Sequence, residues 1–207
     1  MKSPNTAVLD YGMGNLGSVA NMVRHIGASA ELVRSPSSIG DFQSIILPGV
    51  GQFGTAMDRL RDKGWVEALN EARERGAWIL GICLGMQLMT RSSEESDCKG
   101  LGWFDLQTRR IPDRPEAGGR RRVPHMGWNE VRFLEKAEDL ARYYFVHSYC
   151  VQEVDAASCW AVTEYEGFRF ASAIRDERVW GVQFHPEKSH RFGKALLRRF
   201  LCLQTEG

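Results

Sequence analysis

Residues Gly76–Met89 have the sequence Gly-Ala-Trp-Ile-Leu-Gly-Ile-Cys-Leu-Gly-Met-Gln-Leu-Met, and this stretch decides the fold of the chain. Its first part, Ala77–Ile82, is apolar without any alternation between apolar and polar residues. Such a run is typical of a strand that is covered on both faces, as in a parallel sheet. Met86–Arg91 then predicts a helix. At about 13 residues the apolar stretch is too short to span a membrane, so no membrane association is expected.

Between the predicted strand and helix lies Gly81–Gly85, which has the pattern Gly-x-nucleophile-x-Gly with Cys83 at its centre. A tight strand-to-helix turn puts the central residue in strained backbone, and small neighbours let the chain fold back closely. Cys83 would then lie at a helix N-terminus, where backbone amides and the helix dipole favour a thiolate. The alternative is a small buried apolar residue, the usual state of a free cysteine, and this stretch alone leaves both open.

The segments around this stretch predict an α/β fold with an open, mostly parallel sheet flanked by helices. Before it, strands are expected at 7–11, 30–33 and 44–47, and helices at 16–26, 55–61 and 65–75. Residues 92–100 are polar and predict a loop. After residue 123 extra, antiparallel strands are expected at 129–133, 142–146, 149–151, 160–164, 168–174 and 179–184, before a helix from 188 or 189 to 203. No internal repeat or low-complexity linker divides the chain, which indicates a single domain over residues 1–207.

Two glycine turns follow predicted strands. Gly12–Asn15 could cradle a phosphate, but no third glycine follows at the required spacing, and an ordinary turn is favoured. Pro48–Gly51 could instead leave backbone amides free for a negatively charged oxygen, with Gly49 and Gly51 on either side of Val50. An ordinary Pro-Gly turn explains this second segment equally well on its own residues.

A second chemical motif, His185-Pro186-Glu187, follows the strand predicted at 179–184. Residues two apart on an extended chain point to the same side, and proline favours extended backbone in the residue before it. The Glu187 carboxylate could therefore fix the tautomer of His185 and stabilise its cation. Together with Cys83, these residues match a thiol nucleophile, its base and the group that orients the base.

Composition excludes several other classes of function. The chain has 27 Lys and Arg against 26 Asp and Glu, so it lacks the excess basic charge that a broad nucleic-acid surface needs. Its five cysteines include no Cys-x-x-Cys pair, which indicates neither a disulfide framework nor a zinc site. The other histidines, at positions 25, 125, 147 and 190, do not have the sequence spacing that is typical of metal ligands. We expect a reducing compartment, and the absence of an export signal pattern favours the cytoplasm.

The segment Arg109–Arg122 is rich in Arg, Gly and Pro and includes the run Arg120–Arg122. A solvated, flexible loop is the favoured interpretation. The alternative is contact with an acidic partner surface or a phosphorylated substrate, and the sequence leaves this open.

Three motifs together resemble the class I (triad) glutamine amidotransferases: Leu47–Gly51, Gly81–Gln87 and Gly181–Glu187. Within that class, three further segments are similar to the glutaminase subunits of imidazole glycerol phosphate synthases: Asp10–Leu16, Pro124–Asn129 and Tyr144–Tyr149. The resemblance covers nearly the whole chain. It implies the flavodoxin-like sheet of that class, hydrolysis of glutamine to glutamate, and no cofactor or metal.

The resemblance also implies roles for individual residues. Cys83 would attack the side-chain amide of glutamine, with His185 as the base and Glu187 as its orienter. The amide of Leu84 and an amide of Gly49, Val50 or Gly51 would hold the oxyanion. Gln87 and the backbone near Ser148 and Tyr149 would bind the substrate.

The resemblance further implies that ammonia passes to a synthase partner. In histidine biosynthesis that partner is a (β/α)₈ barrel cyclase, which would form a heterodimer with this chain through a face that includes Asn15 and Trp128. Close relatives serve nitrogen transfer onto nucleotide-linked sugars, so a sugar-modifying partner is one alternative. A stand-alone cysteine hydrolase is another, and it would be fully active without a partner. A binding module with a vestigial site is disfavoured, because all three residue types of the triad are present.

Overall fold

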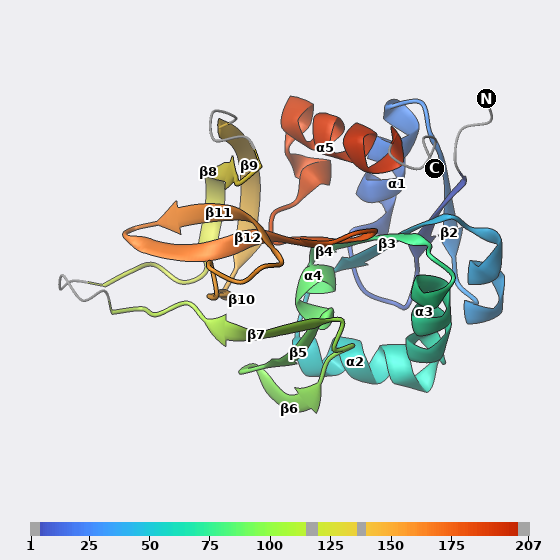
Figure 1. The fold of residues 1–207 in the computed structure, drawn as a ribbon, viewed down its shortest axis with the longest axis horizontal. Helices are drawn as coiled ribbons and strands as arrows, with labels where there is room; N and C mark the ends of the chain where they lie inside the picture. Colours follow the sequence, from blue (N-terminus) through green and yellow to red (C-terminus); the bar gives the residue numbers. More distant parts are fainter. Residues whose placement is uncertain (1–4, 115–119, 136–139, 203–207) are drawn as a thin grey trace.

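In the computed structural model, which describes residues 5–114, 120–135 and 140–202, one sheet of 13 strands connects most of the chain (Figure 1). The main path of the sheet runs in the order β2-β1-β3-β4-β13-β12-β10-β7-β5-β6. Strands β11, β8 and β9 branch from β12. Among the described residues, no helix is both long and apolar enough to cross a membrane.

The first half of the sheet is parallel, as its apolar runs predict. It contains β1 (Asn5–Leu9), β2 (Ser29–Val33), β3 (Ser44–Gly49), β4 (Trp78–Cys83) and, beside β4, β13 (Val179–Val182). Alternate residues of each central strand enter opposite cores: Ile45 and Leu47 pack into one, and Ile46 into the other. The unbroken apolar run is therefore explained by burial on both faces.

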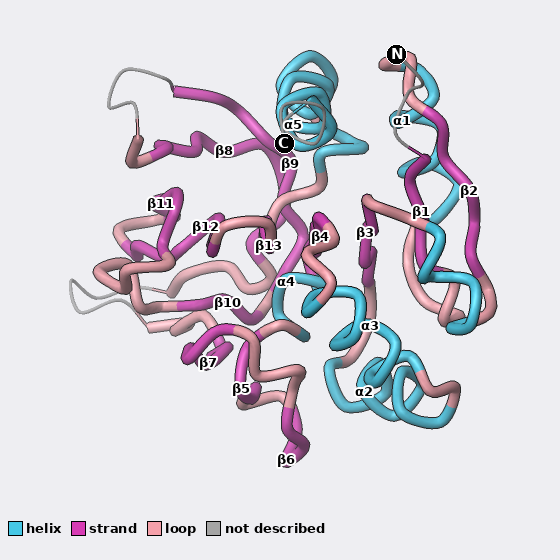
Figure 2. The backbone as a smooth tube through the Cα atoms, turned by 45° about the vertical axis from the view of Figure 1, so that its right-hand side comes forward, coloured by secondary structure: helices cyan, strands magenta, loops and turns pink. Residues whose placement is uncertain are grey.

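Helices cover both faces of this parallel half, as expected (Figures 1 and 2). On one face lie α1 (Leu16–His25) and α5 (His190–Cys202), and on the other lie α2 (Phe53–Asp62) and α3 (Trp65–Glu74). A short 3₁₀ helix, Pro36–Asp41, connects β2 to β3. The carboxyl ends of the parallel strands are left for loops, which is where such sheets place their sites.

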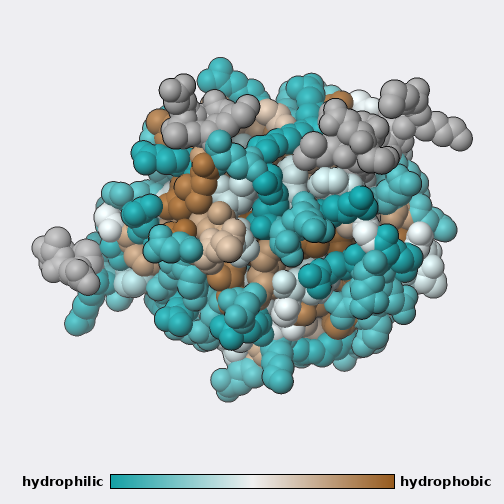
Figure 3. Space-filling view, in the orientation of Figure 1, coloured by the Kyte–Doolittle hydropathy of each residue, from teal (hydrophilic) through white to brown (hydrophobic). Residues whose placement is uncertain are grey.

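The second half of the sheet is mainly antiparallel, as predicted. Strand β12 (Phe168–Asp176) pairs antiparallel with β13 and with β10 (Tyr149–Val151). The branch consists of β11 (Cys159–Tyr165), β8 (His125–Phe133) and β9 (Leu140–His147). In Figure 3 apolar residues gather over this branch. The branch also has a hollow of about 430 Å³, whose lining combines Leu134, Leu140 and Val162 with five polar or charged residues.

Two local predictions were wrong. The helix expected at 86–91 is α4 (Leu84–Leu88), a single turn, and the loop expected at 92–100 contains β5 (Thr90–Ser93) and β6 (Ser96–Lys99). Backbone amides of a later segment end the helix: Leu101 donates to the carbonyl of Leu88, and Trp103 donates to that of Met89. The polar residues of this segment predicted a loop, but in the structure a hydroxyl among them is satisfied within the protein. Thr90 Oγ1 donates to the carbonyl of Gln87 at 2.8 Å.

A further strand, β7 (Phe104–Arg110), was not predicted, and it extends the sheet between β10 and β5. Its residues alternate between buried and exposed, but a charged end conceals the pattern in the sequence. Of the Arg-rich segment, Arg120–Arg122 are described, whereas Gly118 and Gly119 lie outside the described residues. Arg121 is buried and donates to the carbonyl of Glu166 at 3.0 Å, so this part of the segment is anchored, contrary to the flexible loop expected.

The close approach of α4 to β3 depends on the glycines of the Cys83 turn. A Cβ on Gly85 would lie 1.9 Å from the carbonyl oxygen of Leu47, and a Cβ on Gly81 would lie 2.7 Å from the Gly85 backbone. The expectation that small neighbours let the chain fold back is therefore confirmed. Any side chain at Gly85 would push the helix off the strand.

We predict that Gly85→Ala lowers the free energy of unfolding by at least the ~1–3 kcal/mol that overpacking typically costs. Gly17→Ala is the matched control, because a Cβ on this α1 residue meets nothing within 4 Å. It should leave stability unchanged or raise it by up to about 1 kcal/mol, since alanine favours the helix. Urea unfolding of the two variants measures the difference, and equal midpoints would contradict the packing argument.

Candidate active site

The strand register brings the two glycine-flanked motifs together. Gly49, the last residue of β3, pairs with Cys83, the last residue of β4. The loop that continues from β3 therefore leaves the sheet beside the cysteine, as the motifs predict. A Cβ on Gly49 would lie 2.8 Å from Leu84 Cβ and 2.9 Å from the Tyr11 hydroxyl, so only glycine fits between these neighbours.

Cys83 occupies a strained turn between β4 and α4. Its backbone has φ +54° and ψ −108°, an unusual conformation for a residue with a side chain. The residue is 6% exposed, and its Sγ lies 3.9 Å from the carbonyl oxygen of Val146. Because α4 has only five residues, Cys83 precedes a single helical turn and not the N-terminus of the longer helix that the sequence predicts.

His185 and Glu187 make the contact that their spacing predicts, although through a different backbone. His185 Nδ1 lies 2.8 Å from Glu187 Oε1, and both side chains are 2% exposed. The extended segment ends at His185, and Pro186–Lys188 form a 3₁₀ turn. This turn, not an extended chain, brings the carboxylate to the imidazole. Ser189 Oγ donates to the His185 carbonyl at 2.6 Å and holds the turn.

The second ring nitrogen of His185, Nε2, is buried and has no partner with hydrogen-bond geometry among the described residues. Burial lowers the pKa of His185, but interactions with Cys83 and Glu187 outweigh it and raise the pKa to about 10. The imidazolium of His185 therefore persists through neutral pH. A buried cation between two anions can both stabilise a thiolate and donate a proton.

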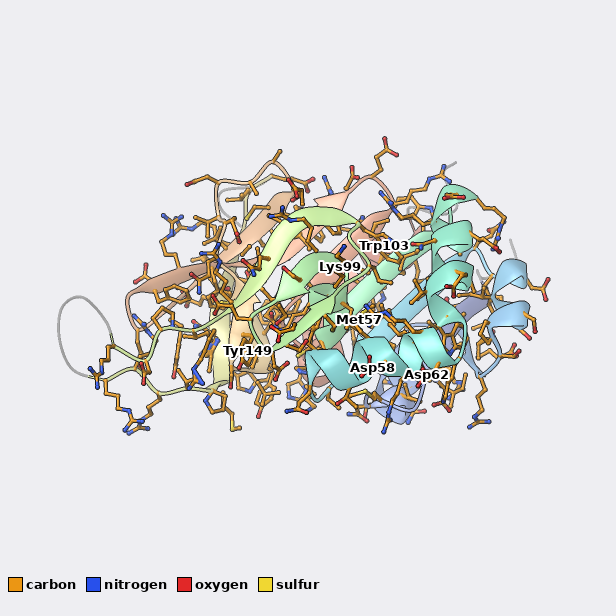
Figure 4. The ribbon with its side chains drawn as sticks, turned by 90° about the horizontal axis from the view of Figure 1, so that it is seen from below. Met57, Asp58, Asp62, Lys99, Trp103 and Tyr149 are labelled. Carbon is orange, nitrogen blue, oxygen red and sulfur yellow. The ribbon has the colours of Figure 1, made fainter. Side chains whose placement is uncertain are left out.

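A pocket of about 350 Å³ opens beside Cys83. Its lining includes the sequence-predicted residues Val50, Gly51, Leu84, Gln87, Ser148 and Tyr149. It also includes Glu95, Pro124, Val146 and His147, which the sequence analysis did not assign to a site. In Figure 4, Tyr149 lies nearer the beginning of α2, whereas Asp62 lies at the other end of this helix. Gly49, which the sequence analysis also assigned to the site, is not among the lining residues.

Comparisons with known proteins agree with this geometry. The family model "Glutamine amidotransferase class-I" matches residues 7–203. The chain belongs to the class I glutamine amidotransferase family. It is 42% identical over 94% of its length to a Methanococcus maripaludis protein named "Imidazole glycerol phosphate synthase subunit HisH 2", of which 98% is covered. It is 43% identical over the same share to a Moorella thermoacetica protein named "Imidazole glycerol phosphate synthase subunit HisH", of which 92% is covered.

Solved structures support the fold of this amidotransferase. One described as "Crystal structure of glutamine amidotransferase" superposes with a TM-score of 0.75 at 18% identity, over 97% of this chain and 98% of that one. "Structure of PurLQS from Thermotoga maritima" gives 0.74 at 17% identity, over 99% and 100% of the two chains. At these identities the likeness establishes the sheet architecture.

Two residues that sequence reasoning missed support the glycine loop and the pocket of the amidotransferase. The Tyr11 hydroxyl donates to the Pro48 carbonyl at 2.9 Å and thereby holds the start of the loop. Glu95 Oε2 accepts from the Phe53 amide at 2.8 Å, and its negative charge at the pocket suits the ammonium group of an amino acid. Glu95 was concealed because its polar segment predicted a loop.

Gln183 was also missed, although it lies in one of the quoted motifs. It is fully buried, and its Nε2 lies 3.7 Å from Cys83 Sγ. The signal was available, since Gln183 stands two residues before His185 on the same extended segment. Alternation along a strand would have placed both side chains on one side.

The turn at Gly12 does not suit a phosphate. Its amide donates to Asp10 Oδ1 at 3.2 Å, and its carbonyl accepts from the guanidinium of Arg59. The amide that a phosphate would need is thus already engaged by a carboxylate. The ordinary turn favoured by the sequence analysis agrees with these contacts.

The histidines outside the triad separate into two groups. His25 and His190 are exposed. His125 and His147 are buried, and Nδ1 of His125 lies 3.1 Å from Nε2 of His147. Burial lowers the pKa of His125 to about 4 and that of His147 to about 3, so both are neutral at physiological pH. Among the described residues, no group of three or more His, Cys, Asp or Glu could hold a metal ion.

The two residues expected at a partner interface lie on the surface. Asn15 is exposed and precedes α1 without a side-chain capping hydrogen bond. Trp128 is 42% exposed on β8, and its ring stacks on His190 with 5.5 Å between ring centroids. Neither lines the pocket, so neither is placed to touch a substrate within it.

We predict that the imidazole of His185 titrates near pH 10 and that Glu187→Gln lowers this pKa, because the substitution removes one of the negative charges that stabilise the cation. The imidazolium, present below the folded pKa, is then lost at a lower pH. Nuclear magnetic resonance of the His185 ring across a pH series measures both values. Glu31→Gln, an exposed charge on the edge strand β2, is the control and should titrate like the wild type. A wild-type value near 6.5 would contradict the buried charge arrangement.

Proposed function

We propose that this chain is the glutaminase subunit of an imidazole glycerol phosphate synthase. It hydrolyses glutamine to glutamate and supplies ammonia for histidine biosynthesis. The observation that carries the proposal is the convergence of Cys83, His185 and Glu187 beside a pocket bordered by the Gly49–Gly51 loop. The full-length similarity to proteins named as subunits of that synthase supports the pathway.

In this mechanism the Cys83 thiolate attacks the side-chain amide carbon of glutamine. The negative charge that develops on the amide oxygen meets the N–H of Leu84 and an N–H of the Gly49–Gly51 loop. Imidazolium His185 gives its proton to the departing nitrogen, and ammonia leaves with the C–N bond broken. A thioester of glutamate on Cys83 remains.

Hydrolysis of the thioester reverses the role of the histidine. Neutral His185 removes a proton from water as the water attacks the thioester carbon, and the Cys83 thiolate leaves as glutamate is released. Glu187 stabilises the imidazolium at both stages without carrying the proton itself. The 2.8 Å contact to His185 Nδ1 supports this role, since it leaves Nε2 for the reacting atoms.

The rest of the pocket suits the amino-acid end of glutamine. Glu95 would attract its ammonium group, while backbone near Ser148 and Tyr149 would bind its polar atoms. Gln87 lies one turn along α4 from Cys83, and its side chain donates to the Tyr149 carbonyl at 2.9 Å. This contact supports a role in holding the substrate-binding backbone in place.

The partner in this proposal is a (β/α)₈ barrel cyclase that forms a heterodimer with the chain in the cytoplasm. Three large apolar side chains support a docking face: Val50 on the glycine loop, and Met126 and Trp128 on β8, are all exposed. Val50 also lines the pocket, so a partner on this face would contact the loop beside the nucleophile. Asn15 would lie within the same interface.

Cys83→Ala should lower glutamine hydrolysis by several orders of magnitude, because loss of one member disables the whole catalytic unit. The fold should survive, since alanine is small enough for the turn. The complex with a histidine-pathway cyclase should still use free ammonia, because only the ammonia supply is lost. Cys98→Ala, at a partly buried cysteine outside the pocket, is the control. Near wild-type glutaminase in Cys83→Ala would remove Cys83 from the mechanism.

The isolated chain should be a poor glutaminase that its partner activates. Glycines on both sides let the Val50 peptide turn with little steric cost, and Gly51 already has φ +113°. One missing oxyanion donor costs about 10²–10³ in rate, enough for a switch. Glutamate release is measured for the chain alone, with the cyclase, and with the cyclase and its acceptor.

Trp128→Ala should weaken this activation, whereas Leu134→Ala, just beyond the other end of β8, should not. Full activity of the chain alone would favour a stand-alone hydrolase. Activation only by a sugar-modifying partner would move the chain to another pathway. If activation is unchanged in Trp128→Ala, the switch at the Val50 peptide is still supported, but the partner binds at a face that does not depend on Trp128.

A further inference from the structure

A chain of buried side-chain amides joins the strand beside the pocket to the nucleophile. Gln87 Nε2 donates to the carbonyl of Tyr149 at 2.9 Å and to Oε1 of Gln183 at 3.0 Å. Gln183 Nε2 in turn lies 3.7 Å from Cys83 Sγ. Gln183 does not line the pocket and is fully buried, so its side chain faces protein groups rather than substrate.

The orientation of both amides follows from the first acceptor. The Tyr149 carbonyl can only accept, so Gln87 must present its NH₂ group there and to its second neighbour. Gln183 must then offer its oxygen to Gln87, which directs its own NH₂ group to the sulfur. A reversed Gln183 would set two NH₂ groups against each other and an oxygen against the sulfur, leaving buried groups unsatisfied.

The Tyr149 carbonyl that begins this chain is itself held in place. His147 Nδ1 lies 2.9 Å from it, and because the Tyr149 oxygen only accepts, His147 is the donor. Nε2 of neutral His147 then accepts from Nδ1 of His125. The oxygen thus accepts two hydrogen bonds, one from Gln87 and one from His147, and cannot release Gln87 without losing a buried contact.

Cys83 has different partners in its two protonation states. A thiol can donate to the Val146 carbonyl, 3.9 Å from Sγ, but a thiolate has no hydrogen to give and gains nothing from an oxygen. The thiolate needs donors. His185 interacts with the sulfur electrostatically, and Gln183 Nε2 is the N–H donor whose hydrogen bond to the sulfur the described residues show.

We propose that Gln183 is a further catalytic residue, whose N–H stabilises the Cys83 thiolate and whose orientation is imposed by Gln87 and the Tyr149 carbonyl. The inference rests on the proposed function in that it concerns the same nucleophile. The physical effect is nevertheless separate from glutamine turnover, because it is an effect on the ionisation of the sulfur. Hydrogen bonding to a charged form favours that form.

Gln183→Met tests the proposal, because methionine has a similar length and no N–H. The pH dependence of Cys83 alkylation by iodoacetamide, followed by mass spectrometry of the Cys83 peptide, reports the thiolate directly. We expect the midpoint to rise by about one pH unit, because a hydrogen bond to a charged group is worth roughly tenfold or more in an equilibrium constant. In the complex, kcat for glutamine should fall about tenfold while KM stays near the wild-type value.

Two further variants separate the hydrogen bond from packing. Gln183→Glu keeps the shape but adds a negative charge beside the sulfur, so it should raise the midpoint more than methionine does, and it also serves if Gln183→Met does not fold. Gln152→Met is the matched control, since that amide donates to the Arg110 carbonyl outside the pocket. It should leave both the alkylation profile and kcat unchanged.

An unchanged alkylation midpoint in folded Gln183→Met or folded Gln183→Glu would overturn the proposal. So would a loss of kcat without any shift of the midpoint, which would indicate packing alone. If the wild-type chain hydrolyses no glutamine with any partner, the proposed function is wrong. If the alkylation midpoint is nevertheless higher in Gln183→Met than in the wild type, this inference is supported. The two failures are therefore distinguishable.

Discussion

The structure depends on the direct contact between helix α4 and strand β3, which has no room for a side chain. The carbonyl oxygen of Leu47 occupies the place of a Cβ on Gly85, and Gly81 admits the same turn from the other side. Because the helix starts so close to the strand, the chain must reverse at Cys83, and the backbone there is strained. The register that pairs Gly49 with Cys83 then brings the loop after β3 to the nucleophile. The position of Cys83 and the strain in its backbone thus both follow from the close packing of α4 on β3.

Burial makes the triad an all-or-none arrangement. Moving any charged group out of water, whether a carboxylate, an imidazolium or a thiolate, costs free energy. His185 nevertheless gains a raised pKa, because Cys83 and Glu187 favour its cation more than desolvation disfavours it. The His185 cation thus depends on both neighbours, so the members of the unit cannot be assigned independent contributions. The side-chain amides of Gln183 and Gln87 connect Cys83 by hydrogen bonds to the Tyr149 carbonyl on the strand beside the pocket.

The site combines the two halves of the sheet. The parallel half supplies the reacting groups at the carboxyl ends of β4 and β13, while the antiparallel half supplies Val146, Ser148 and Tyr149. Glu95 reaches the pocket from the turn between β5 and β6 and accepts from the beginning of α2. A doubly wound sheet alone would carry a nucleophile and a base with an open side, and the additional strands enclose that side.

Local rules of the chain determined much of this protein. Apolar runs without alternation require burial on both faces, which specified the parallel strands, and the glycines around Cys83 specified the turn. The spacing of His185 and Glu187 predicted their contact. Tertiary structure alone decided the rest, because it depends on partners distant in sequence. Amides of Leu101 and Trp103 end α4 early, and the hydroxyl of Thr90 is satisfied inside a strand that looks like a loop. Gln183 finds its donor, Gln87, and its acceptor, the Cys83 sulfur, about a hundred residues away. A sequence states which groups need hydrogen-bond partners, and only the folded chain decides which partners they find.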